Sequence, residues 1–247
     1  MAMSGLFFVL LGMAIGSFLN VCIDRLPKGE SIVSPPSQCD TCGRRLALLD
    51  LIPVVSYLRY RGSCRYCQSS IPRRYLWVEL GTGLLFGLIW LRFPAIDMAG
   101  FVACSSAILI VVLVIDLEHQ KILNRVVFPA IGFALLAALF IPEPSLGERF
   151  LGGLAGFGIL LLLAYLSPAG MGMGDVKLMA FVGLLVGFPH VLLVLFLSFV
   201  LGGLISGVLL AAKRIGRRDP IAFGPFIALG TITTLFYGEQ IIRWWWG

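Results

Sequence analysis

Charged residues are scarce in this sequence. Only 13% of its 247 residues are charged, whereas 59% are hydrophobic, and the mean hydropathy is +0.96. A soluble globular protein needs more charged residues than this to cover its surface. The composition therefore indicates a polytopic membrane protein. The sequence also lacks a basic stretch before its first apolar run. We therefore expect that run to stay as a membrane helix and not to act as a cleaved signal peptide.

The sequence also lacks the solvated basic face that nucleic-acid-binding proteins present. Its formal net charge is +6, but the lysines and arginines lie in short connections between apolar runs. A nucleic-acid surface instead combines basic and aromatic side chains on one exposed face. We therefore expect the lipid bilayer, and no nucleic acid, as the partner that explains this composition.

Eight apolar stretches predict eight membrane-spanning helices, because a bilayer crossing needs about 20 apolar residues. The one long polar segment, Asp24–Arg74, follows the first stretch. The sixth stretch is short and is followed by Pro189, so we expect it to be shallow or to continue past a kink. The predicted spans are Ser4–Ile23, Tyr75–Leu91, Met98–Ile115, Val126–Ile141, Phe150–Leu166, Leu178–Phe188, Val191–Ala212 and Ile221–Ile242.

The predicted fold is therefore an all-α polytopic membrane protein with about eight transmembrane helices. We expect three parts: a first helix (1–23), a cysteine-containing segment (24–74) and a seven-helix core (75–247). If the cysteine-containing segment is cytoplasmic, sixteen of the nineteen lysines and arginines fall in cytoplasmic connections, as the positive-inside rule requires. This orientation puts both Asp116 and Asp175 on the cytoplasmic side and the C-terminus in the periplasm.

Four cysteines in the polar segment form two Cys-x-x-Cys pairs, Cys39/Cys42 and Cys64/Cys67. Two such knuckles can supply four thiolates in a tetrahedron, the arrangement that structural zinc prefers. The alternative is a pair of disulfides, but thiols stay reduced in the cytoplasm. We expect the zinc ion to stabilise the fold of a segment that has little core of its own.

Two acidic residues, Asp116 and Asp175, stand at the borders of apolar stretches. An ionisable group at the edge of a bilayer is costly to hold there, so it marks a candidate functional site. Gly172 and Gly174 leave space for an extended peptide beside Asp175, and we expect them to form the active-site loop together with Lys177. Structural alternatives remain open, because Asp175 is also typical of a helix N-cap and Asp116 of a helix end at the water boundary.

If the two carboxylates meet, they form an acid–base pair. Two carboxylates that share a site do not both ionise easily, so one keeps a proton while the other acts as a base. Such a pair can activate water against a peptide carbonyl and protonate the leaving amine. The sequence has no convincing Ser/His/Asp set and no His-Glu-x-x-His motif, which leaves other protease classes unsupported. The strongest alternative is an ion- or proton-coupled transporter that uses the aspartates as a relay.

These features belong to motifs that occur in order along the chain. The motifs are Gly16-Ser-Phe-Leu-Asn20-Val-Cys-Ile-Asp-Arg25-Leu-Pro27, the four cysteines, Asp116-Leu-Glu-His119, Gly172-Met-Gly-Asp175-Val-Lys177 and Phe223-Gly-Pro225-Phe-Ile-Ala-Leu-Gly230. On these motifs the chain resembles the type IV prepilin peptidases, which are membrane aspartic proteases of the Gly-x-Gly-Asp type.

The resemblance implies cleavage of the basic leader from type IV prepilins or type II secretion pseudopilins, at the cytoplasmic face of the bacterial inner membrane. Asp116 and Asp175 match the family's catalytic aspartates. Many relatives then methylate the new N-terminal amine with S-adenosylmethionine, and the intact cysteine segment agrees with that bifunctional branch. The sequence has no glycine-rich loop that would mark a site for the methyl donor, so the cofactor-binding residues stay unknown.

Overall fold

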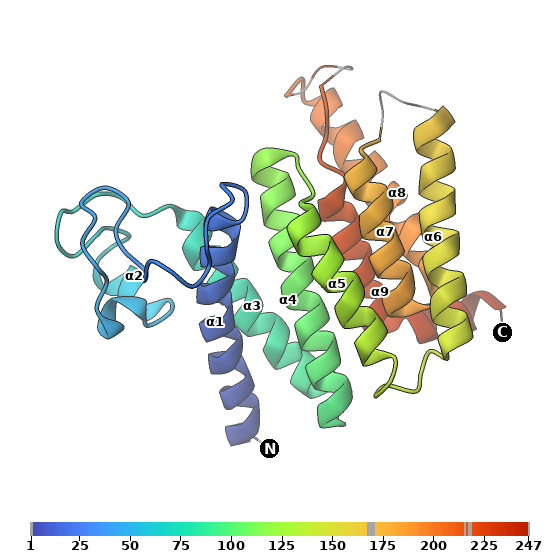
Figure 1. Ribbon diagram of the computed structural model, residues 1–247, viewed down its shortest axis with the longest axis horizontal. Helices are drawn as coiled ribbons and strands as arrows, with labels where there is room; N and C mark the ends of the chain where they lie inside the picture. Colours follow the sequence, from blue (N-terminus) through green and yellow to red (C-terminus); the bar gives the residue numbers. More distant parts are fainter. Residues whose placement is uncertain (1, 167–170, 215, 217–218, 247) are drawn as a thin grey trace. The chain divides into compact units, whose positions relative to one another are not determined.

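The structure, a computed structural model, describes residues 2–166, 171–214, 216 and 219–246 (Figure 1). It is helical, as the sequence predicts, and the described residues contain two isolated β-bridges but no strand. A short 3₁₀ helix, η1 (Leu48–Leu51), and a short helix, α2 (Val55–Arg59), lie in the polar segment. The long helices are α1 (Ala2–Arg25), α3 (Arg73–Arg92), α4 (Ile96–His119), α5 (Asn124–Ala137), α6 (Leu146–Leu166), α7 (Met173–Val186), α8 (His190–Ala211) and α9 (Gly224–Trp246).

Each predicted span corresponds to one long helix, although the number of crossings is only partly supported. By length and composition, four of the described helices can cross a membrane, namely α1, α4, α6 and α8. Helix α7 has 14 residues, which corresponds to about 21 Å of helix and falls short of a hydrocarbon core of about 30 Å. The eight crossings and the side of the membrane on which each loop lies remain predictions.

The sixth predicted span differs most from the structure. The sequence predicts a helix over Leu178–Phe188, whereas α7 begins at Met173 and ends at Val186. The helix ends where Gly187 adopts a φ of +74°, a left-handed conformation that favours glycine. Because α7 begins early, Asp175 lies in its first turn and not in the preceding loop.

The chain forms two compact units, residues 1–111 and 112–247, and the boundary falls inside α4. The first unit therefore groups the cysteine-containing segment with α1 and α3. The predicted division into residues 1–23, 24–74 and 75–247 remains a prediction. Each unit is described separately below.

In the first unit, α1 and α3 pack closely along their lengths. Their contact depends on small residues, since a methyl group on Gly12 would lie 2.7 Å from Cβ of Phe86. The polar segment between these helices, residues 24–74, has almost no core. All of its residues are described, and Cys64 is the only buried one among them. We call residues 24–74 the cysteine segment.

In the second unit, α7 is the central helix. It contacts α5, α6, α8 and α9, and Figure 1 shows it flanked by α5 and α6. Most of its side chains are buried, from Asp175 near its start to Val186 at its end. A helix that is apolar on all sides is expected to be enclosed in this way, so the first turn of α7 is placed firmly within the unit.

Two contacts fix α7 against α6. A methyl group on Gly152 would lie 2.4 Å from the carbonyl oxygen of Gly183, so these backbones approach as only glycine allows. Arg149 is 1% exposed, and its guanidinium donates hydrogen bonds to the carbonyls of Leu184 and Leu185, both at 3.3 Å. These bonds occupy carbonyls at the end of α7 that have no partner within the helix.

Candidate active site and metal centre

Asp116 lies in the last turn of α4 and is 4% exposed. Its Oδ2 atom accepts a hydrogen bond of 2.9 Å from the backbone N–H of Gly224. Gly224 is the first residue of α9, so the carboxylate meets the positive end of a helix. This burial disagrees with the alternative in which Asp116 only marks where a helix meets water.

Asp175 is the third residue of α7 and is 8% exposed. Its Oδ2 atom accepts a hydrogen bond of 3.2 Å from the backbone N–H of Gly172, which is the N-cap residue. Asp175 is therefore not the N-cap itself, although its carboxylate does satisfy one free amide at the helix start. Its Oδ1 atom is buried and accepts no hydrogen bond from the described residues. One oxygen is held in place, while the other is buried without a hydrogen-bond partner among the described residues.

The structure brings these two buried carboxylates together. They lie close enough that the charge of Asp116 acts on Asp175. Interacting like charges in a buried site disfavour full ionisation of both groups. The arrangement is therefore compatible with an acid–base pair.

Ile122 lies where the segments that carry the two carboxylates converge. A methyl group on Gly174 would lie 2.8 Å from Cβ of Ile122, and one on Gly224 would lie 3.3 Å from its Cδ1 atom. Ile122 thus contacts the residue next to Asp175 and the residue that donates to Asp116. Gly174 provides room for this side chain, in addition to any role in admitting a peptide.

Sequence reasoning did not select Ile122 or Gly224 as site residues. The Gly-Pro step at residues 224 and 225 was the available signal, since proline favours the first turn of a helix and glycine allows close approach to its N-terminus. An isoleucine in a loop gives no comparable signal.

Lys177 lies in α7, two residues after Asp175, and its side chain reaches α5. Its Nζ atom donates a hydrogen bond of 3.1 Å to Oδ1 of Asn124 and lies 5.8 Å from the ring centroid of Phe128. No ion pair joins Lys177 to Asp116 or Asp175 among the residues that the structure describes. The structure therefore supports a role for Lys177 in joining α7 to α5.

Replacing Gly224 with alanine is expected to reduce the rate of the expected peptidase reaction about 100-fold, as a displacement of a reactive group by about 1 Å can do. The new methyl group would lie 2.7 Å from Asp116 Oδ2, so the carboxylate must move. A gel-shift assay of substrate cleavage measures this effect. Gly203→Ala is the control because no atom lies within 4 Å of the added group. Equal rates for the two variants would contradict the assigned position of Asp116.

The four cysteines of the cysteine segment come together, as the sequence predicts. The Sγ atoms of Cys39, Cys42, Cys64 and Cys67 all lie within 4.8 Å of one another, and all four thiols are free. Sγ of Cys39 lies 3.8 Å from Sγ of Cys67. Zn–S bonds of about 2.3 Å in a tetrahedron require sulfur atoms about 3.8 Å apart. The cluster therefore fits a zinc ion, and it does not form the alternative disulfides.

The two knuckles repeat the same backbone pattern. The carbonyl of Cys39 accepts a hydrogen bond from the Gly43 N–H at 2.8 Å, and the carbonyl of Cys64 accepts one from the Gln68 N–H at 3.0 Å. Each knuckle is closed by one isolated bridge between the residues that flank it. This repetition places the two pairs of thiols in matching geometry around one point.

At two of the four cysteines, hydrogen bonds within the knuckles favour the thiolate form that a metal needs, whereas desolvation and the neighbouring thiols of Cys67 and Cys39 raise the pKa of Cys42 to about 11. The backbone amide of Cys42, followed by the Ser69 hydroxyl, lowers the pKa of Cys39 to about 6. The Ser69 hydroxyl, 3.2 Å from the sulfur of Cys67, also lowers the pKa of that thiol. Both groups are therefore ready to bind a cation near neutral pH.

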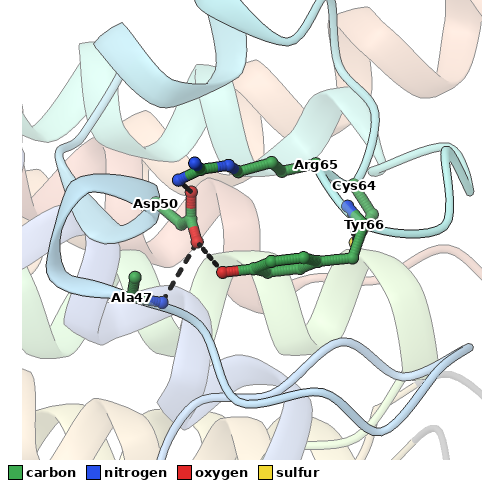
Figure 2. Close-up of polar contacts among 5 residues, drawn as sticks. All are labelled: Ala47, Asp50, Cys64, Arg65 and Tyr66. Atoms are coloured by element: carbon green, nitrogen blue, oxygen red, sulfur yellow. Dashed lines mark hydrogen bonds and ion pairs between the residues drawn. The ribbon is translucent and has the colours of Figure 1, made fainter.

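A polar contact ties the second knuckle to the rest of the cysteine segment (Figure 2). Oδ2 of Asp50 accepts hydrogen bonds from the Tyr66 hydroxyl at 3.3 Å and from the Ala47 N–H at 3.1 Å. Asp50 Oδ1 lies 3.9 Å from Nη1 of Arg65. Tyr66 and Arg65 lie between Cys64 and Cys67, so Asp50 links η1 to the metal centre.

Replacing Gln68 with glycine is expected to increase zinc affinity about threefold. Gln68 has a φ of +63°, whereas the equivalent position in the first knuckle is Gly43 with a φ of +66°. A side chain in this region costs about 1 kcal/mol, part of which is offset by the flexibility of glycine in the unfolded chain. Competition with a chromogenic chelator measures the affinity. The reverse change, Gly43→Gln, is expected to weaken binding, and the opposite order would contradict the equivalence of the two positions.

Two family models match the chain. A model described as the bacterial peptidase A24 N-terminal domain matches residues 10–93, and one described as the type IV leader peptidase family matches residues 103–207. The first match contains the four cysteines, and the second contains both Asp116 and Asp175. No solved structure matches the chain.

Several curated proteins named prepilin leader peptidase/N-methyltransferase are similar to the chain over almost its full length. The protein from Bacillus subtilis is 34% identical over 96% of this chain and 95% of its own length. The protein from Pseudomonas aeruginosa is 32% identical over 95% of this chain and 91% of its own length. The protein from Dichelobacter nodosus is 32% identical over 96% of this chain and 93% of its own length.

Proposed function

We propose that this chain, which belongs to the prepilin leader peptidase/N-methyltransferase family, is a membrane aspartic endopeptidase. Its substrates are type IV prepilins or type II secretion pseudopilins, from which it removes the basic leader. The observation that carries the proposal is the pair of buried, interacting carboxylates, Asp116 and Asp175, in otherwise apolar helices.

In the proposed reaction, one carboxylate acts as a base and the other as an acid. The ionised member takes a proton from water as the water oxygen attacks the scissile carbonyl. The protonated member then gives its proton to the leaving amine as the C–N bond breaks. Asp175, with Oδ1 free of hydrogen bonds, suits contact with water, whereas the Gly224 N–H holds Asp116 in position.

The reaction is proposed to take place at the cytoplasmic border of the bacterial inner membrane. The apolar helix of a prepilin lies in the bilayer, so its leader junction reaches the border where both aspartates are expected. The cysteine segment lies on the same side and the C-terminus in the periplasm, as the positive-inside rule favours.

The second proposed activity is methylation of the new N-terminal amine. When bound, S-adenosylmethionine supplies an electrophilic methyl group to a deprotonated amine and becomes a neutral thioether. The printed name of the relatives includes this activity. We also propose that the cluster of Cys39, Cys42, Cys64 and Cys67 holds a structural zinc ion.

Mass spectrometry of a prepilin after incubation with the purified protein and S-adenosylmethionine tests both activities. We expect a product that has lost its leader and gained the mass of one methyl group at its N-terminus. Loss of the leader without the methyl group would restrict the function to cleavage. An unchanged substrate, with proton flux through the protein in liposomes, would support the transporter alternative.

A further inference from the structure

A cavity of about 280 Å³ lies in the unit of residues 1–111. It forms where α1 ends, α3 begins and the cysteine segment folds over both. Its wall includes Asp24 from α1, Tyr75 and Glu79 from α3, and Tyr57 and Tyr60 from the cysteine segment. The volume is near the lower end of the range for small-molecule sites, about 300–1,000 Å³. The size therefore fits a small organic ligand better than a folded protein segment.

The cavity is lined by more acidic than basic side chains. All five carboxylates between residues 24 and 79 line it, namely Asp24, Glu30, Asp40, Asp50 and Glu79. Only three of the nine basic residues in the same stretch do so, namely Arg25, Lys28 and Arg65. An acidic wall in an otherwise basic segment favours a ligand with positive charge.

Glu79 is the carboxylate best suited to meet that charge. It is 7% exposed, and no basic side chain pairs with it in the part of the chain that the structure describes. By contrast, Asp24 is already paired with Arg74 at 2.5 Å. Burying a carboxylate without a cation is costly, so a cationic ligand beside Glu79 would relieve that cost.

The backbone of Val54, which is hydrogen-bonded to Glu79, is strained. Oε2 of Glu79 accepts a hydrogen bond of 2.7 Å from the N–H of Val54, and Val54 has a φ of +62°. This conformation is unfavourable for a β-branched residue, and such strain is common where a ligand is held. The hydrogen bond fixes one oxygen of Glu79 and joins the cysteine segment to α3.

The remaining lining supplies the other groups that a nucleoside ligand needs. Tyr57, Tyr60 and Tyr75 offer aromatic surfaces, which stack on flat rings and attract cations. Arg25 ends α1 and Lys28 follows it. Both side chains can pair with a carboxylate of the ligand.

From these observations we propose that the cavity binds S-adenosylmethionine, with Glu79 as the acidic residue that recognises its sulfonium charge. The inference rests on the methylation part of the proposed function. The ligand carries a sulfonium and an ammonium group, an adenine ring and one carboxylate, and the lining provides a counterpart for each. The N-terminal ammonium of a processed prepilin also carries a positive charge. It is the end of a polypeptide, however, and it has no adenine ring and no separate carboxylate to match the rest of the lining.

Calorimetric titration of the zinc-loaded, full-length protein with S-adenosylmethionine and S-adenosylhomocysteine tests the inference. S-adenosylhomocysteine lacks the sulfonium charge, so the wild-type protein is expected to prefer S-adenosylmethionine. Glu79→Gln keeps an oxygen for the Val54 N–H, and we expect it to weaken S-adenosylmethionine binding at least tenfold and to remove the preference. Glu143→Gln is the matched control because Glu143 is exposed and does not line the cavity. The zinc content of each preparation checks that the cysteine segment is folded.

The possible outcomes distinguish an error in the proposed binding site from an error in the proposed methylation activity. If Glu79→Gln binds both ligands as the wild type does, the site is wrong while methylation still stands. If the variant weakens both ligands equally, Glu79 has a structural role only and the proposed recognition is wrong. If the variant fails to methylate a prepilin while binding S-adenosylmethionine normally, the cavity holds the prepilin ammonium. If the wild-type protein neither binds the donor nor methylates, the methylation part of the proposed function fails.

Discussion

Replacing Asp116 or Asp175 with asparagine is expected to abolish prepilin cleavage and leave the protein folded in the membrane. Acid–base catalysis contributes about 10²- to 10⁴-fold to the rates of such reactions, so either change lowers the rate by at least that range. Asparagine keeps the size of the side chain and an oxygen that can accept the Gly224 or Gly172 N–H. It cannot exchange a proton with water, so the loss would be chemical and not structural.

Asp97→Asn is the matched control for this experiment. Asp97 lies in the first turn of α4, in the same helix as Asp116 but at its other end, and it is exposed. The control is expected to cleave at the wild-type rate. The assay measures the mobility shift of a leader-bearing prepilin in membranes that contain equal amounts of each variant. Full activity in either Asp116→Asn or Asp175→Asn would exclude the acid–base pair.

The parts of the site that the sequence predicts are those that depend on local spacing or on chain topology. Two Cys-x-x-Cys knuckles need only a few backbone hydrogen bonds each to present their thiols, so the cysteine cluster follows from the sequence. Asp116 and Asp175 are separated by an even number of predicted crossings, so both fall at one border of the membrane. Their burial and mutual approach agree with that reasoning.

The parts that the sequence does not predict depend on packing between distant segments. Ile122 acquires its position only because Gly174 and Gly224 approach it from two other segments. Arg149 is one of the three basic residues that fall outside the cytoplasmic connections in the topological argument, and the structure shows it buried and bound to carbonyls of α7. Neither residue belongs to a periodic pattern or a spaced motif that a single sequence can reveal.

The two units divide the proposed activities between them. Both candidate catalytic aspartates lie in residues 112–247, whereas the metal centre and the acidic cavity lie in residues 1–111. The two family models divide the chain at nearly the same place. Damage to the cysteine segment is therefore expected to affect the binding of S-adenosylmethionine directly.

Removing zinc is expected to unfold the cysteine segment. Because Cys64 is the only buried residue between positions 24 and 74, burial of side chains contributes little to the stability of this region. Zinc bound to four thiolates contributes about 10–16 kcal/mol in small zinc-binding peptides near neutral pH, which is comparable to a typical domain's total stability of about 5–15 kcal/mol. Limited proteolysis after treatment with a chelator would then cleave between residues 24 and 74 first. Binding of S-adenosylmethionine would be lost in parallel.

The matched variants for this prediction are Cys64→Ser and Cys104→Ser. Cys64 supplies one of the four clustered thiols, whereas Cys104 lies in α4 outside the cluster and is exposed. We expect about one zinc per chain in the wild-type protein and in Cys104→Ser, and almost none in Cys64→Ser, as measured by elemental mass spectrometry. A four-thiolate site that loses one ligand also loses the bound cation that joins the two knuckles, so we expect the segment to open. Wild-type protein that lacks zinc and resists proteolysis would show that the four sulfur atoms are held together by the chain alone.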